Sequence, residues 1–249
     1  MCAIVKKSKQ AVGKIHKGGD NILFDLHIHT DISDGRLKSE NLATQLRAHC
    51  SFRTITDHDD PSYHLESDNG CSFTGVEITS DIREFDAFAD FLFYGFDKVD
   101  IPLLNKKEHL VFNMRPKQLS EYLQPIKDRT GAKLFLAHPY RSYASLPLYN
   151  LFIDPRGKLD KQNTSERPKK TLEDILDYCV NFVDGFECLH PSAKTEEDVV
   201  FLLEYCRKNK KLASGGSDLH GTTFTIPKYQ HLVEEYSDLF QWIPEMAAK

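Results

Sequence analysis

Histidine and carboxylate side chains occur where predicted strands end. His27 and His29 are separated by one residue, so both side chains project from one face of a strand and can reach one ion. Asp34 follows in a short loop, and the pair Asp218 and His220 repeats the same spacing near the end of the chain. Imidazole and carboxylate ligands without thiolates suit zinc, manganese or ferrous iron. The spacing therefore predicts a metal centre.

The same kinds of side chain follow three other predicted strands. His58 is flanked by Asp57 and Asp59, Glu77 ends the next strand, and His138 directly follows a short apolar strand. One histidine in such a position is more often structural, but five strand ends with ligand groups favour a metal site. Because these ligands exceed the needs of one tetrahedral ion, we expect two or three divalent ions. Paired ions can bridge a hydroxide and orient a phosphoryl group, which favours phosphate-ester hydrolysis.

Four residues are candidates for contact with substrate or for proton transfer: His58, Asp59, Arg141 and His190. The guanidinium of Arg141 suits a phosphoryl oxygen, although an exposed surface role is an equal alternative. His190 follows a predicted strand and could contact the substrate or the leaving group. Asp59 and its neighbour Asp57 could orient His58 or act on a proton, and ordinary loop capping is the alternative.

A long predicted loop, residues 141–170, is locally basic. It contains seven lysines and arginines against three acidic residues, in a chain of net charge -5. An excess of positive charge beside a metal ligand favours attraction of an anionic substrate, and a merely solvated loop is the alternative.

Hydrophobic periodicity predicts strands that alternate with helices. The predicted strands are 21–29, 53–56, 73–78, 88–94, 134–137, 183–188 and 211–214, and the predicted helices begin at Ser39, Pro116, Thr171 and Thr195. Alternation of this kind predicts parallel βαβ units and a closed or nearly closed α/β barrel. In such barrels the active site lies at the C-terminal ends of the strands, where the candidate ligands fall.

Composition bounds the class of protein. A chain of 249 residues with 40% hydrophobic content fits one large domain, which we expect at 21–249 after a basic N-terminal arm at 1–20. The net charge of -5 argues against a surface built throughout for nucleic acid or acidic membranes. Six cysteines without a C-x-x-C pair, and no signal or membrane segment, predict a cytoplasmic protein. No stable protein partner is predictable.

The motifs together resemble those of the PHP (polymerase and histidinol phosphatase) superfamily. In chain order they are His27-x-His29 with Ser33-Asp34-Gly35, Thr56-Asp57-His58-Asp59, Gly75-Val76-Glu77, Ala137-His138-Pro139 and Gly216-Ser217-Asp218-x-His220-Gly221. The match spans about residues 22–221. Aspartate at position 34, where several relatives have histidine, resembles the branch of small phosphoesterases that act on nucleotides and short oligonucleotides.

The resemblance implies a distorted seven-stranded (β/α)7 barrel with up to three metal ions at its C-terminal mouth. It implies a first ion bound by His27, His29, Glu77 and Asp218, and another surrounded by Asp34, His58 and His220. Glu77 would bridge to a middle ion bound also by His138.

One position departs from the family pattern. Relatives usually have a further histidine where this chain has Leu92, three residues before Gly95. Asp90 shares a strand face with Leu92, but on the predicted strand direction it lies about 7 Å farther from the strand end. We therefore expect two tightly bound ions and a labile third, with Asp90 contributing little.

The leading hypothesis is a metal-dependent phosphoesterase that acts on a phosphomonoester or phosphodiester through a metal-bridged hydroxide. Its substrate would be a phosphorylated small molecule, with a nucleotide or short oligonucleotide preferred. Two alternatives stay open. One is another metal-dependent hydrolase, and the other is a non-catalytic PHP module that binds metal or nucleic acid within a larger assembly.

Overall fold

The computed structural model describes residues 23–40, 42–82, 87–105, 114–140 and 172–249. Four predicted features lie outside the described residues: the basic arm at 1–20, Arg141, the basic loop that continues to residue 170, and the helix start at Thr171. None of the helices in the described ranges has the length and apolar character needed to span a bilayer.

The described strands form two sheets. A small parallel sheet pairs β1 (Phe24–Asp25) with β2 (Phe52–Arg53). The larger sheet has the order β3 (Gly75–Ile82), β4 (Ala87–Tyr94), β5 (Lys133–Leu136), β6 (Gly185–Leu189) and β7 (Leu212–Gly215). Two isolated bridges connect the chain beyond β1 and β2 to the larger sheet. One joins Ile28 to Leu219, which follows β7, and the other joins His58 to Glu77 of β3.

The expected α/β class is confirmed, but the expected parallel barrel is not. Strand β4 runs antiparallel to both β3 and β5, whereas β5, β6 and β7 are parallel to one another. Residues 83–86 separate β3 from β4, and so short a connection reverses the chain direction because a parallel crossover needs about a dozen residues. Within the described part of the chain, single bridges rather than continuous pairing join the two sheets, so no continuous seven-stranded barrel is formed.

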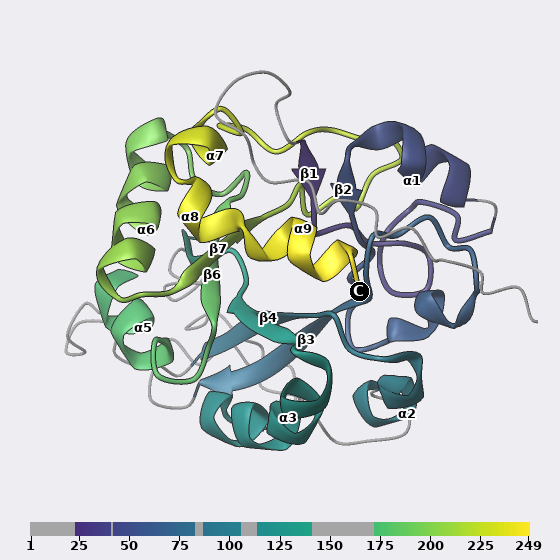
Figure 1. The fold of residues 1–249 in the computed structure, drawn as a ribbon, viewed down its shortest axis with the longest axis horizontal. Helices are drawn as coiled ribbons and strands as arrows, with labels where there is room; N and C mark the ends of the chain where they lie inside the picture. Colours follow the sequence, from purple (N-terminus) through teal and green to yellow (C-terminus); the bar gives the residue numbers. More distant parts are fainter. Residues whose placement is uncertain (1–22, 41, 83–86, 106–113, 141–171) are drawn as a thin grey trace, which may run out of the picture.

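Helices flank the sheets, as Figure 1 shows. They are α1 (Ala43–His49), α2 (Ile101–Leu104), α3 (Pro116–Thr130), α5 (Leu172–Cys179), α6 (Glu196–Lys208), α7 (Leu232–Glu235), α8 (Ser237–Phe240) and α9 (Trp242–Ala247), with 3-10 turns η1 (Pro61–Leu65) and η3 (Lys98–Asp100). Helix α3 packs against β3, and α6 packs against β6 and β7. The C-terminal helices α7, α8 and α9 follow one another across the molecule from α6 toward β2 (Figure 1).

Local sequence explains where two of these helices begin. The Thr195 hydroxyl accepts a hydrogen bond from the backbone of Asp198, and the Asp198 carboxylate accepts one from the Thr195 N–H, which forms a capping box. Pro116 occupies the first position of α3, as expected. The prediction that Ser39 caps a helix was wrong, since α1 begins at Ala43 and the Ser39 N–H donates to Asp31 instead.

The core lies between the larger sheet and its helices. Trp242 of α9 packs its ring against Phe135 at 4.8 Å and against Tyr94 at 5.5 Å between centroids, and its Nε1 donates to the carbonyl of Ala213. Tyr94 lies at the end of β4 that pairs with the beginning of β5. The aromatic core therefore closes the end of the sheet remote from the C-terminal ends of β5, β6 and β7. We call the edge formed by those C-terminal ends the site edge.

Candidate metal centre

His27 and His29 lie just beyond β1 and are both completely buried. His27 Nε2 lies 3.1 Å from Glu77 Oε2 and 3.5 Å from Asp218 Oδ1. His29 Nε2 lies 3.2 Å from each of the same two carboxylate atoms. The four residues expected around the first ion are thus brought together.

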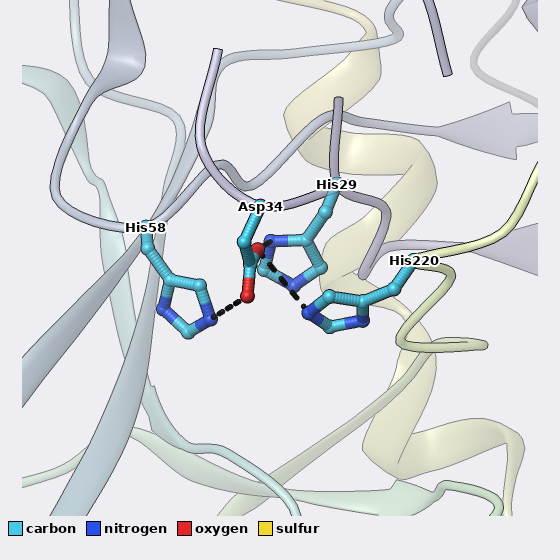
Figure 2. A group of neighbouring side chains, drawn as sticks. All are labelled: His29, Asp34, His58 and His220. Carbon is cyan, nitrogen blue, oxygen red and sulfur yellow. Dashed lines mark ion pairs between the residues drawn. The ribbon is translucent and has the colours of Figure 1, made fainter. Parts of the chain in front are cut away.

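A second group surrounds Asp34. Figure 2 shows His29, Asp34, His58 and His220 turned toward one another, and one ligand atom from each lies within 4.8 Å of the others. Asp34 is 3.3 Å from His220, 3.7 Å from His29 and 3.9 Å from His58 in ion-pair contacts. Asp34, His58 and His220 are the three residues expected around another ion, and His29 lies in the same group. The side chains of Asp34, His58 and His220 are 56%, 29% and 32% exposed, so this group opens to solvent.

A third group contains His138, which directly follows β5. His138 Nε2 lies 3.0 Å from Glu77 Oε1 and 3.7 Å from Asp90 Oδ2. His27, Glu77 and His138 form one potential ligand set, and His58, Glu77 and Asp90 form another. Glu77 therefore contacts all three groups, in line with its expected bridging position.

The expected placement of Asp90 was wrong. Because β4 is antiparallel to β5, its beginning and not its end lies at the site edge. Leu92 pairs with Phe135 and with Glu77, and it is completely buried. Asp90 lies two residues nearer the site edge than Leu92, and its carbonyl accepts a hydrogen bond from the N–H of Ala137.

Glu187 is a buried residue of the site that the sequence motifs missed. Its Oε1 lies 3.0 Å from Nδ1 of His27, and its Oε2 accepts a hydrogen bond of 2.8 Å from the backbone N–H of His138. The sequence did contain one signal for Glu187, namely a single carboxylate in the otherwise apolar strand Gly185–Leu189. Because an unpaired charge is rarely buried completely, such a residue is expected to have a partner.

His190 lies beside two of the expected ligands, His27 and Asp218. Its Nε2 is 3.4 Å from Asp218 Oδ2, its Nδ1 is 2.8 Å from the Ser192 hydroxyl, and it forms a potential ligand set with His27 and Asp218. The contact with Ser192 leaves Nε2 as the ring atom that faces the site. His190 is therefore available either to an ion or to a substrate.

Two buried aspartates fix the loops that carry ligands. Asp57 accepts hydrogen bonds from the Thr30 N–H, the Thr30 hydroxyl and the Ser33 hydroxyl, each 2.7 Å long, which secure the loop before Asp34. Asp25 accepts from the N–H and the hydroxyl of Ser217 at 2.8 and 2.7 Å. The loop-capping interpretation therefore holds for Asp57.

Three site residues have positive φ angles: Asp59 at 51°, His138 at 28° and Asp218 at 51°. Non-glycine residues rarely adopt this region, and the strain persists where surrounding contacts fix the backbone. The Oδ1 of Asp59 accepts a hydrogen bond of 3.3 Å from the Thr79 N–H, and its own N–H donates to Glu77. Asp59 is thus held beside Glu77.

The electrostatics of the site favour added positive charge. Burial lowers the pKa of His27, but the carboxylates of Glu77, Glu187 and Asp218 outweigh burial and hold that pKa well above its usual value. For His29, burial is likewise outweighed by Asp218 and Glu77, and the pKa rises to about 9. Burial raises the pKa of Glu77, but the neighbouring histidines hold it well below its usual range. Protons or metal ions can supply the charge that these carboxylates attract.

The donor set fits divalent metal ions. Neither ring nitrogen of His29 makes a well-aligned hydrogen bond with any described residue, although both are buried and carboxylates lie close by. A buried imidazole without such a bond is costly unless another partner satisfies it. Clustered imidazole and carboxylate atoms without sulfur suit zinc, manganese or iron.

No protein-family model and no curated protein matches the chain. Among the solved structures that resemble it, three share 16% sequence identity with this chain. One from Bifidobacterium adolescentis, whose metal-dependent phosphoesterase function is itself a prediction, has a TM-score of 0.51 and covers 90% of this chain and 96% of its own. An amidohydrolase from Chromobacterium violaceum, with bound sulfate and no metal, has a TM-score of 0.52 and covers 80% of this chain and 87% of its own.

A third structure, a two-domain protein from Bacteroides vulgatus with a predicted PHP-like metal-dependent phosphoesterase domain, has a TM-score of 0.44. It covers 80% of this chain, which spans 52% of that protein. The likeness to the Bifidobacterium adolescentis and Chromobacterium violaceum structures is one of fold. To that extent it agrees with the resemblance drawn from the motifs: the chain shares its fold with these two proteins.

Proposed function

We propose that the chain is a metal-dependent phosphoesterase whose substrate is a phosphorylated small molecule or a short oligonucleotide. The observation that carries the proposal is the convergence of His27, His29, Glu77 and Asp218, from segments far apart in the sequence, on contacts of 3.1–3.5 Å. Eight residues would bind the ions: His27, His29, Asp34, His58, Glu77, His138, Asp218 and His220. Two or three zinc, manganese or iron ions bound there would activate water and neutralise charge on a phosphoryl group.

The exposure of the ligands suggests how substrate enters. Asp34, His58 and His220 are partly exposed, whereas His27, His29 and Glu77 are buried. A phosphoryl group would therefore approach past the exposed group, with the leaving group toward solvent. His58 and His190 are our candidates for protonating the leaving group, Asp59 for orienting or accepting a proton, and Arg141 for binding a phosphoryl oxygen.

The preference for nucleotides or short oligonucleotides rests on Asp34, which resembles that branch of the PHP superfamily. The Chromobacterium violaceum structure of related fold is of an amidohydrolase, which makes amide hydrolysis the second candidate function. The same ions could polarise an amide carbonyl.

A substrate panel tests the two candidates. The metal-free protein would be reconstituted with manganese or zinc and assayed on a nitrophenyl phosphate, a bis-nitrophenyl phosphate, mononucleotides, short oligonucleotides and N-acyl amino acids. We expect turnover of phosphate esters that a chelator abolishes. Turnover of amides alone would replace the proposal with the amidohydrolase function. His231→Ala is the matched control, because His231 pairs with Glu196 on the surface.

A further inference from the structure

Leu92 has no metal-binding atom at the position where relatives have a histidine, but the carboxylate of Asp90 lies close by. Asp90 and Leu92 are two residues apart on β4, so their side chains share a face of the sheet. Leu92 is opposite Glu77 in the β3–β4 pairing, and Asp90 is opposite Thr79, so all four side chains are on that face. The antiparallel direction of β4 puts Asp90 nearer the site edge than Leu92.

The carboxylate of Asp90 is oriented by a hydrogen bond. The Thr79 hydroxyl donates to Oδ1 of Asp90 at 2.7 Å. The other oxygen, Oδ2, lies 3.7 Å from Nε2 of His138, which itself lies 3.0 Å from Glu77 Oε1. Ligand atoms of Asp90, Glu77 and His58 also lie within 4.8 Å of one another. One oxygen is therefore anchored by Thr79, while the other lies beside His138.

We infer that Asp90 is a ligand of the middle divalent ion, together with Glu77 and His138, at the place where relatives use a histidine at the position of Leu92. The inference rests on the metal binding that the proposed function requires and is independent of the substrate. Two carboxylate oxygens and one imidazole nitrogen form a harder donor set than one with a second imidazole. The middle ion of this chain is therefore manganese or ferrous iron in preference to zinc.

Metal content separates this inference from a purely structural role for Asp90. Metal-free protein and its Asp90→Asn variant would be titrated with manganese by calorimetry, and bound metal counted by elemental analysis after gel filtration. We expect three ions per chain in the unaltered protein and two in Asp90→Asn. Asp90→Glu should keep three. Asp128→Asn, on the exposed face of α3, is the matched control and should also keep three.

Two further variants keep the test decisive if Asp90→Asn folds poorly. Thr79→Val removes the bond that orients Asp90 and should weaken binding of the third manganese about 10-fold to 100-fold, the usual range for a residue that positions a ligand. Adding Leu92→His to Asp90→Asn supplies an imidazole and should restore a third ion, now with zinc preferred. Circular dichroism of each variant would confirm the fold.

The possible outcomes distinguish this inference from the proposed function. An unchanged count and affinity in Asp90→Asn would overturn the role of Asp90, even if the protein hydrolyses phosphate esters. A drop to two ions in a protein that hydrolyses no phosphate ester would support Asp90 and overturn the proposed function. No bound manganese in the unaltered protein would overturn both.

Discussion

Nδ1 of His27 lies 3.0 Å from Oε1 of Glu187, and both side chains are completely buried. This contact fixes Nδ1 of the ring, so Nε2 is the nitrogen that faces Glu77 and Asp218. The second oxygen of Glu187 holds the backbone of His138. One carboxylate from β6 therefore orients two of the expected ligands, an arrangement common around metal-bound histidines.

We expect Glu187→Gln to weaken metal binding about 10-fold to 100-fold, because the amide keeps the size of the side chain but loses the charge that orients His27. Calorimetric titration of the metal-free protein with manganese measures this. Glu204→Gln, on the surface of α6, is the matched control. An affinity within twofold of the unaltered protein would show that Glu187 has no part in positioning the ligands.

Replacing His27, His29 or Asp218 by alanine should each lower kcat/KM by about 10²-fold to 10³-fold, or about 3–4 kcal/mol, because each change removes an expected ligand of the first ion. The measurement is phosphate release from the best substrate of the panel, with metal content determined on the same samples. Activity close to that of the unaltered protein in any of the three variants would remove that residue from the site.

The buried His64 predicts how stability depends on pH. Burial lowers the pKa of His64 to about 4, and its Nε2 contacts the backbone of Ile55 and Gly75. The unfolded chain, with an ordinary histidine pKa, therefore binds a proton that the folded chain rejects between about pH 6.5 and pH 4. Stability is fully present above this window and is lost as the pH falls through it, by about 2 kcal/mol between about pH 7 and pH 5.

Urea unfolding of the metal-free protein and of His64→Gln, measured across this range, tests the prediction. The stability advantage of the unaltered protein over the variant should shrink by about 2 kcal/mol at the acidic end. A constant difference between the two proteins would mean that His64 accepts a proton in the folded state as readily as in the unfolded state.

Gly216 allows the segment after β7 to pass closely over His27. A Cβ atom at position 216 would collide with the Cβ and the backbone of His27. We expect Gly216→Ala to destabilise the protein by about 1–3 kcal/mol and to displace His27 or Asp218. Thermal unfolding and metal content measure the two effects. Gly221→Ala is the control, since a Cβ there would make an ordinary contact with Leu219, and equal behaviour of both variants would refute the steric argument.

The gathering of the expected metal ligands at one place could be predicted because it depends on short sequence patterns. Two histidines one residue apart on a strand share a face in any fold, and a histidine directly after an apolar strand lies at the edge of a sheet. These rules predicted that His27, His29 and His138 lie at the site, and all three contact Glu77 in the structure.

The direction of β4 could not be predicted in the same way. Alternation of apolar and polar residues has the same period in parallel and antiparallel strands, so the pattern at 87–94 does not say which end faces the site. Only the short connection at 83–86 carried that information, and assuming a parallel strand placed Asp90 on the wrong side of Leu92. Glu187 could not be assigned to the site from local patterns, because its partners His27 and His138 are distant in sequence.

The gradient of exposure across the site has a consequence for the exchange of ions. An ion among Asp34, His58 and His220 can gain water as it leaves, whereas one between His27 and Glu77 must wait for buried side chains to move. A chelator should therefore empty the outer position quickly and the inner one slowly. A protein with this arrangement would retain its inner ion when free metal is briefly scarce. The occupancy of its outer position would instead follow the free metal concentration.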